Sequence, residues 1–193
     1  MKTTIGIVVF DDVEELDFVG PWEVFQSAAH QGADFATVLI AEHERPVRCA
    51  KRLRVLPEAT FAVAPPLDVL LVPGGQGTRR EATNPAMLRF ISDRAPRCRW
   101  ITSVCTGALL LHEAGVSRGK RVTTHFSFIE KLRERGADVA AGERYVRDGN
   151  LVSAAGVSAG IDMALWLVGQ IVDPAFARKV QDWIEYHPQP PYA

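Results

Sequence analysis

The chain has 193 residues and a formal net charge of −1, and 47% of its residues are hydrophobic. This length suits one compact domain, residues 1–193, with a sizeable core. No stripe of basic residues stands out, and the pair Arg79-Arg80 is interpreted as solvated surface, so nucleic-acid binding has no electrostatic support. No apolar run approaches the roughly 18 residues of a membrane span, so no membrane partner is expected.

The first half of the chain alternates strand and helix patterns. The run 4–10 is almost wholly apolar and β-branched, which is typical of a strand buried on both faces of a parallel sheet. A loop at 11–17 precedes a helix that starts at Gly20-Pro21, with the proline at its first position. The further elements expected are a strand at 35–41, a β-ribbon at 46–56, a strand at 67–72 and a helix from Asn84-Pro85 to about 94.

The second half continues the alternation. A strand-prone run from residue 99 leads into a helix that ends near 114, and a short strand at 121–124 ends at His125. A helix at 127–135 is followed by a hairpin at 145–153 around Asp148-Gly149. Two helices are expected last, at 157–172 and from Asp173-Pro174 to about 186.

These elements predict an α/β fold with a mostly parallel sheet and helices on both of its faces. In such sheets the ligand crevice lies outside the carboxyl ends of the strands. Asp17, Gly74-Gly75 and Cys105 each follow a predicted strand. They are distant in sequence, yet the fold brings them to one rim, and this convergence indicates a functional site.

Cys105 lies in a segment typical of a nucleophile elbow, in which a reactive side chain stands on a tight turn between a strand and a helix. Small residues are needed two positions to either side, and Ser103 and Gly107 occupy those positions. The start of the following helix favours a thiolate. The alternative is a buried cysteine that acts only as a small hydrophobic residue.

Asp17 differs from the other acidic residues of its loop, which are interpreted as a solvated turn. It lies between Leu16 and Phe18, so its surroundings are expected to be buried. Burial near a thiolate raises the pKa of a carboxyl group. Asp17 could therefore stay protonated and act as a general acid.

Four further residues are candidates at the same rim. Gly74-Gly75 can direct a backbone amide at developing negative charge, or can form a plain tight turn. Thr106 either caps the helix or positions water or substrate, and His125 is the candidate base for Cys105 or a structural histidine. No group of His, Cys, Asp and Glu has metal-ligand spacing, so no metal is expected.

The three cysteines, at 49, 98 and 105, indicate a reducing compartment, because their number is odd and no pattern suggests a disulfide framework. The N-terminal apolar run is too short for a signal sequence. We therefore expect a cytoplasmic protein.

Several motifs together resemble the ThiJ/PfpI superfamily, and nearly the whole chain takes part. They are the segments 72–75, 102–108, 123–125, 146–151 and 157–162. The opening segment 15–21 and the closing segment 185–191 most resemble the isonitrile hydratase branch. The resemblance implies a flavodoxin-like three-layer sandwich of the class I glutamine amidotransferase type, a homodimer, a small-molecule substrate and no cofactor.

The resemblance also implies roles for individual residues: Cys105 as the catalytic cysteine, Asp17 as an essential aspartate, Thr106 as its neighbour and the Gly75 amide beside the cysteine. The implied reaction is hydration of an isonitrile to an N-substituted formamide. Cys105 attacks the isonitrile carbon while Asp17 supplies a proton, and water then adds to the resulting thioimidate.

Other readings remain open at this point. Protease-like and glyoxalase-like branches of the superfamily tend to carry glutamate at the position of Asp17, and the proteases carry histidine where Thr106 stands, so both residues argue against them. The sensory domains of AraC-type regulators continue into a helix-turn-helix domain, which this sequence lacks up to Ala193. A redox sensor that oxidises Cys105 is a third alternative.

Overall fold

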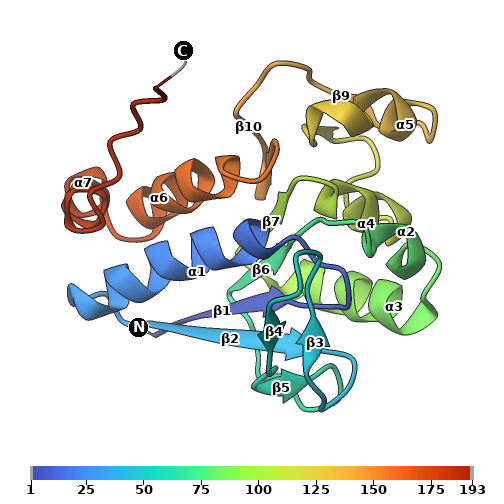
Figure 1. Cartoon of the computed structure of the whole chain (residues 1–193), viewed down its shortest axis with the longest axis horizontal. Helices are drawn as coiled ribbons and strands as arrows, with labels where there is room; N and C mark the ends of the chain where they lie inside the picture. Colours follow the sequence, from blue (N-terminus) through green and yellow to red (C-terminus); the bar gives the residue numbers. More distant parts are fainter. Residues whose placement is uncertain (1, 192–193) are drawn as a thin grey trace.

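The computed structural model describes residues 2–191. Within them a seven-stranded sheet has the order β10-β11-β7-β6-β1-β2-β5 (Figure 1). In that order the strands are Tyr145–Asp148, Leu151–Ala154, Trp100–Val104, Val69–Val72, Thr3–Val8, Phe35–Ala41 and Ala59–Thr60. Neighbouring strands are parallel except in the hairpin β10-β11, so the mostly parallel sheet is confirmed.

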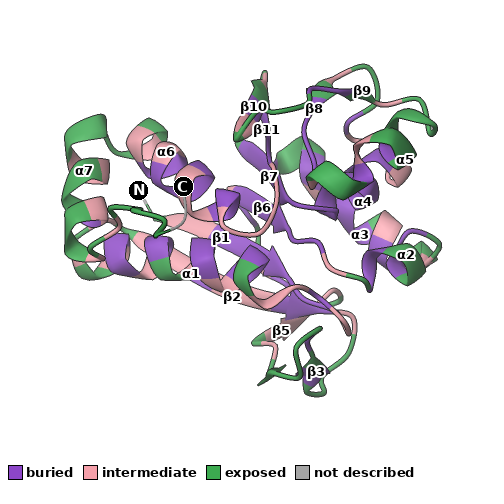
Figure 2. Cartoon of the chain, turned by 45° about the horizontal axis from the view of Figure 1, so that its top comes forward, coloured by how far each residue is buried: buried purple, intermediate pink, exposed green. Residues whose placement is uncertain are grey.

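Helices cover both faces of this sheet (Figures 1 and 2). The helices α1 (Glu15–His30), α6 (Ala159–Ile171) and α7 (Pro174–Trp183) pack together on one face. The helices α2 (Thr78–Glu81), α3 (Pro85–Arg94) and α4 (Gly107–Glu113) form the other layer. Right-handed crossovers explain this division, because the chain moves in opposite directions across the sheet from β1 to β2 and from β6 to β7. The fold is therefore the flavodoxin-like three-layer sandwich.

The central strands are buried because their sequences are apolar on both faces. Every residue of β6 and β7 is buried, and β1 is buried over its last four residues. Figure 2 shows this buried layer between the helices, with α7 largely exposed at the edge. Burial on both faces accounts for the continuous apolar runs from which these strands were predicted.

Smaller elements complete the fold. The predicted ribbon is formed by β3 (Val47–Arg48) and β4 (Arg54–Val55). Two-residue strands β8 (Arg121–Val122) and β9 (Asp138–Val139) pair beside α5 (Ile129–Arg133). The sequence analysis did not predict β5, α2 or β9, and it drew β8 and α5 too long, because elements of two to five residues carry little periodicity.

The prediction that the first helix starts at Gly20-Pro21 is wrong. Helix α1 begins at Glu15, and Pro21 lies inside it. Proline has no N–H to donate to the Asp17 carbonyl one turn earlier, yet burial of the helix face that includes Phe18 and Phe25 holds the helix together. The correction matters for function because Asp17 stands on the first turn of a helix and not in a loop.

The site is positioned by a reversal of strand order at β1. The chain goes from β1 to β2 on one side, and β6 then pairs with β1 on the other side. At such a switch point the segments beyond the strand ends diverge and leave a crevice. The segments that follow β1, β6 and β7 therefore meet at one rim.

Candidate active site

Cys105 lies on a tight turn between β7 and α4, as the nucleophile-elbow interpretation expects. Its φ angle is +57°, a left-handed conformation that residues other than glycine rarely adopt. A side chain at Gly107 would put a Cβ atom 2.0 Å from the Val72 carbonyl oxygen, so only glycine fits two positions after the cysteine. The structure thus has the backbone geometry of an elbow.

Hydrogen bonds hold this strained turn in place. The Cys105 N–H donates to the Ala155 carbonyl at 2.7 Å and to the Ala154 carbonyl at 3.1 Å. The Thr124 hydroxyl donates to the Cys105 carbonyl at 2.8 Å. Both backbone groups of Cys105 are therefore satisfied, and the left-handed conformation is fixed by its surroundings.

The Asp17 carboxyl group is fully buried at the same rim. Its Oδ2 accepts a hydrogen bond from the Gly74 N–H at 2.9 Å, whereas its buried Oδ1 has no such partner among the described residues. Burial raises the pKa of Asp17 from 3.8 to about 7, and the Gly74 amide and the Cys105 thiol offset that rise only in part. The raised pKa that the sequence analysis expected is confirmed.

The Gly74-Gly75 turn is engaged with the candidate site on both residues. The Gly74 amide binds Asp17, and the Gly75 amide donates to the Thr106 hydroxyl at 3.1 Å. A Cβ atom at Gly74 would lie 2.5 Å from the Thr106 nitrogen and 2.8 Å from Asp17 Oδ2. In this arrangement the two amides orient side chains, and neither is free to act as an oxyanion hole.

The expectation that the helix start favours a thiolate at Cys105 is not met in the described state. Burial, together with the negative charge of Asp17, raises the pKa of the Cys105 thiol to about 12. The Thr106 and Val157 amides and the Thr106 hydroxyl bind the sulfur and act in the opposite direction. Helix α4 has only seven residues, and desolvation outweighs its dipole.

Three groups near the sulfur were not identified from sequence. Val157 has a φ angle of +46°, a conformation rare for a β-branched residue, and its amide faces Cys105. Thr78 and Arg79, in α2, both contact the Thr106 hydroxyl, at 3.1 and 3.4 Å. Only the structure reveals them, because α2 has no helical period in the sequence and nothing in the sequence predicts a left-handed Val157.

His125 is not paired with Cys105. Its Nδ1 lies 2.8 Å from the Ser127 hydroxyl, and its ring packs against Gly156. It lines a groove of about 380 Å³ together with the segments 123–126, 142–144 and 155–157. The groove runs beside the elbow, so His125 is placed to contact a bound molecule and does not serve as the base for the cysteine in this arrangement.

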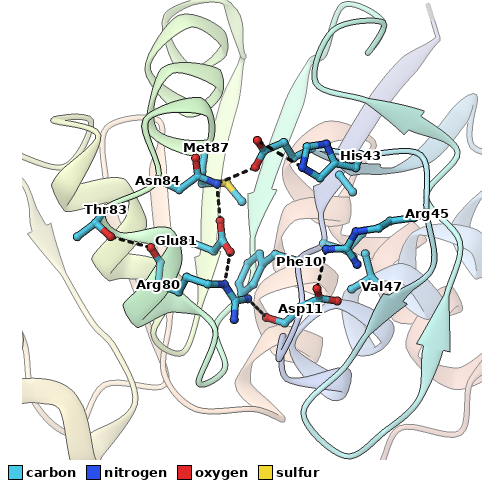
Figure 3. Close-up of a pocket in the computed structure, with 13 residues that line it drawn as sticks. Phe10, Asp11, His43, Arg45, Val47, Arg80, Glu81, Thr83, Asn84 and Met87 are labelled. Atoms are coloured by element: carbon cyan, nitrogen blue, oxygen red, sulfur yellow. Dashed lines mark hydrogen bonds and ion pairs between the residues drawn. The ribbon is translucent and has the colours of Figure 1, made fainter.

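A second cavity, of about 370 Å³, lies between the ends of β1 and β2 and the segment that joins α2 to α3 (Figure 3). Phe10, Val47 and Met87 form part of its apolar wall, and charged side chains form the rest. None of Cys105, Asp17 and Thr106 lines it. The cavity is therefore separate from the candidate active site.

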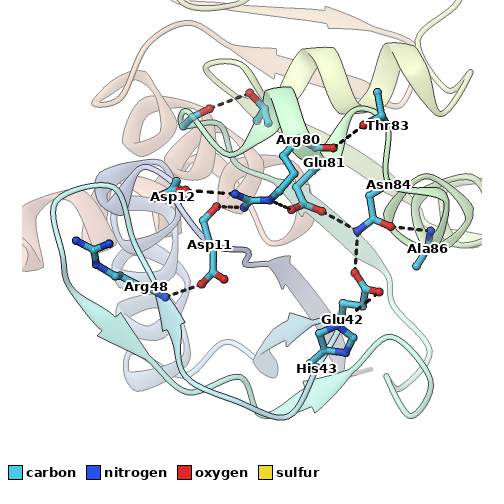
Figure 4. Close-up of polar contacts among 12 residues, drawn as sticks. Asp11, Asp12, Glu42, His43, Arg48, Arg80, Glu81, Thr83, Asn84 and Ala86 are labelled. Carbon is cyan, nitrogen blue, oxygen red and sulfur yellow. Dashed lines mark hydrogen bonds and ion pairs between the residues drawn. The ribbon is translucent and has the colours of Figure 1, made fainter.

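A polar network beside that cavity ties the loop after β1 to α2 and α3 (Figure 4). Arg80 donates to the Asp11 carbonyl at 2.6 Å and to Glu81 Oε1 at 3.0 Å. The Asn84 amide donates to Glu42 at 2.7 Å and to Glu81 at 2.8 Å. The network fixes α2, the helix that brings Thr78 and Arg79 to Thr106.

Residues 2–191 contain no group of three or more His, Cys, Asp and Glu side chains arranged to hold a metal ion. Over the same residues, no helix is both long and apolar enough to span a membrane.

Comparisons with known proteins agree with this fold. Residues 3–170 match the DJ-1/PfpI family. Isonitrile hydratase of Pseudomonas putida is 40% identical over 192 residues, which cover 100% of this chain and 82% of that protein. A crystal structure of a ThiJ/PfpI family protein from Pseudomonas syringae superposes with a TM-score of 0.93 at 36% identity, covering 100% of this chain and 78% of the other. Schizosaccharomyces pombe DJ-1, at 21% identity and a TM-score of 0.80 over 96% of this chain and 100% of that one, shares the fold.

Proposed function

Because this chain belongs to the DJ-1/PfpI family, we propose that it is an isonitrile hydratase that converts an isonitrile and water into an N-substituted formamide. The observation that carries the proposal is the buried Asp17 carboxyl group beside Cys105 on the elbow. The 40% identity of the chain to the isonitrile hydratase of P. putida supports the choice of substrate class. The reaction uses only protein side chains and water.

The first step uses the single proton that the Cys105 thiol and the ionised Asp17 carboxylate share. The sulfur forms a bond to the terminal carbon of R–N≡C, and its proton passes to Asp17 and from there to the same carbon. The product is a thioimidate, R–N=CH–S–Cys105, and Asp17 is again ionised. The pKa of about 7 at Asp17 suits this exchange, because the group both accepts and releases a proton near neutral pH.

The second step adds water. Asp17 takes a proton from a water molecule while the water oxygen bonds to the thioimidate carbon. Asp17 then gives that proton to the thioimidate nitrogen. The hydroxyl proton of the resulting tetrahedral adduct passes to the sulfur by way of Asp17 as the C–S bond breaks. The products are R–NH–CHO and the free Cys105 thiol, so the atoms, protons and electrons balance.

Thr106 and two backbone amides stabilise charge on the sulfur during both steps. The Thr106 and Val157 amides and the Thr106 hydroxyl bind Cys105, and each lowers the pKa of its thiol. Hydrogen bonds to a charged acceptor are stronger than those to a neutral one. They therefore favour the thiolate that leaves when the thioimidate collapses.

We also propose that residues 1–193 form a single domain, that the chain works as a homodimer and that it acts in the cytoplasm on a small molecule. Exposed leucines at the start of α1 and beside the β3-β4 ribbon supply apolar surface for a partner copy, namely Leu16, Leu53 and Leu56. Light scattering during size exclusion should give twice the mass of the chain. A mass equal to one chain would contradict the dimer.

The function is tested by ultraviolet detection of formamide formed from a simple aryl isonitrile. The wild-type chain should turn the substrate over, Cys105→Ala should abolish turnover, and Asp17→Asn should remove most of it. Cys98→Ala, which alters a buried cysteine remote from Asp17, serves as the control and should keep the wild-type rate. Undiminished turnover in Cys105→Ala or Asp17→Asn would refute the assignment.

A further inference from the structure

Arg79 is an exposed residue of α2 whose guanidinium group contacts residues of the candidate site. Its Nη1 donates to the Gly75 carbonyl at 2.9 Å and to the Thr78 hydroxyl at 3.1 Å. Its guanidinium carbon stands 4.6 Å from the centroid of the Phe128 ring, and Phe128 is buried. Arg79 is exposed, as the sequence analysis expects of a surface residue, but its guanidinium group is held by these contacts.

We propose that Arg79 is a positioning residue that, together with Thr78, occupies the Gly75 carbonyl and so leaves the Thr106 hydroxyl free to donate its proton to the Cys105 sulfur. This inference deepens the proposed function and rests on it for the role of Thr106. Arg79 acts through Thr106, whose hydroxyl oxygen its Nη1 also reaches at 3.4 Å, and its charge interacts with Cys105 only through space.

The Gly75 carbonyl oxygen has more donors within reach than it can accept, namely the Arg79 guanidinium, the Thr78 hydroxyl, the Thr78 amide at 3.3 Å and the Thr106 hydroxyl. A carbonyl oxygen has two lone pairs. One receives Arg79 Nη1 at 2.9 Å, and the other receives the Thr78 hydroxyl at 2.8 Å. The Thr106 hydroxyl also lies within reach of this oxygen, at 3.2 Å, but both lone pairs are already occupied.

The Thr106 hydroxyl then has two other acceptors within reach. The Thr106 oxygen accepts a hydrogen bond from the Gly75 N–H at 3.1 Å, and the Thr106 hydroxyl proton needs an acceptor of its own. The Thr78 oxygen lies 3.1 Å away and already accepts from Arg79. The other acceptor is the Cys105 sulfur, which the Thr106 side chain hydrogen-bonds and which gains negative charge during the reaction. A charged acceptor is preferred over a neutral hydroxyl, so the proton turns to the sulfur.

The test compares the rates at which iodoacetamide alkylates Cys105, followed by mass spectrometry of the peptide that contains it. The measurement is made at pH 8, above the pKa of about 7 of Asp17. Arg79→Ala should slow alkylation about threefold, because a tenfold smaller thiolate population is partly offset by the higher nucleophilicity of a more basic sulfur. Arg79→Lys, which keeps a cationic donor, should restore most of the rate.

The matched control is Arg89→Ala, which removes an equal charge from the neighbouring helix α3, where Arg89 is exposed. Arg89 takes no part in the hydrogen bonds that join Arg79 to Gly75 and Thr106, so its loss should leave Cys105 alkylation unchanged. An equal slowing in Arg89→Ala would show that only the general positive charge of these helices matters and would overturn the proposal.

A double-mutant cycle separates positioning from a direct charge effect. In a Thr106→Val background, Arg79→Ala should change the alkylation rate no further, because the hydroxyl through which Arg79 acts is gone. The same threefold loss in that background, or no loss in Arg79→Ala alone, would overturn the proposal. Alkylation needs no isonitrile, so this outcome is independent of the turnover assay: absence of formamide refutes the function, whereas an additive cycle refutes the role of Arg79.

Discussion

The chemistry of the candidate site depends on two acidic groups buried side by side. Burial raises the pKa of Asp17 to about 7 and that of Cys105 to about 12. Between these values the pair holds one proton and one negative charge. A thiol that keeps its proton until substrate arrives, next to a carboxylate that can accept it, suits addition of S–H across an isonitrile carbon better than a permanently ionised cysteine would.

The raised pKa of Asp17 predicts a pH dependence of folding stability. The unfolded carboxyl ionises near 3.8 and the folded one near 7, so between these values the folded state binds more protons. The free energy of unfolding should therefore fall as the pH rises from about 4 to 7, by at most about 4 kcal/mol. Asp17→Asn should remove this fall, as measured by urea denaturation at pH 4.5 and pH 8.

The control for this prediction is Asp93→Asn, which changes an exposed carboxyl group in α3. It should keep the pH dependence of the wild-type chain. An Asp17→Asn variant whose stability falls with pH as steeply as that of the wild type would show that Asp17 ionises normally in the folded state.

Gly74 predicts a steric effect at the site. A Cβ atom there would lie within 3 Å of both the Thr106 nitrogen and Asp17 Oδ2, at 2.5 and 2.8 Å. Gly74→Ala should therefore lower the free energy of unfolding by about 1–3 kcal/mol and should also lower turnover, because it displaces two functional residues.

Gly169→Ala is the matched control for Gly74→Ala, because Gly169 lies inside α6 and a Cβ there would meet its nearest atom at an ordinary 3.5 Å. Removal of a helical glycine should stabilise the chain by up to about 1 kcal/mol with no change in turnover. Equal effects of the two substitutions on turnover would contradict the tight packing around Gly74.

At the scale of elements, the clearest sequence signals are those with a local physical cause. Asn84 caps α3 by accepting from the Ala86 amide at 3.0 Å, and the following Pro85 fits the first turn, so the start and end of this helix match the prediction. The start of α1 was missed because the side chain of its N-cap residue, Glu14, makes no capping hydrogen bond and because tertiary packing holds Pro21 inside a helix. Such packing leaves no local mark in the sequence.

The two side-chain caps of α3 and α7 allow a comparison of local and long-range effects. Asn84→Ala should cost about 2–3 kcal/mol, because it removes a cap and also two hydrogen bonds to the Glu42 and Glu81 carboxylates. Asp173→Ala removes only the bond from the Phe176 amide at 2.8 Å and should cost about 1 kcal/mol. Equal losses in thermal or urea denaturation would show that the Asn84 network contributes nothing.

At the scale of the whole molecule, the position of the site at the carboxyl ends of the strands was predictable from the sequence, but its hydrogen bonds were not. The apolar runs and their alternation with helices gave the parallel sheet, and the rule for strand ends placed Asp17, Gly74 and Cys105 together. The hydrogen bond from Gly75 to Thr106, the orientation of the Val157 amide and the contacts of Arg79 depend on how the segments after β6, β7 and β11 meet. These positions depend on the complete fold, so no local pattern could reveal them.

The central claim is that Cys105 forms a covalent bond to the isonitrile carbon. The most direct test is acid quenching during turnover of an aryl isonitrile, followed by mass spectrometry of the peptide that contains Cys105. The account predicts a transient mass increase equal to one isonitrile on that peptide, which disappears once the substrate is exhausted. Formamide produced at the full rate with Cys105 unmodified at every time point would contradict it.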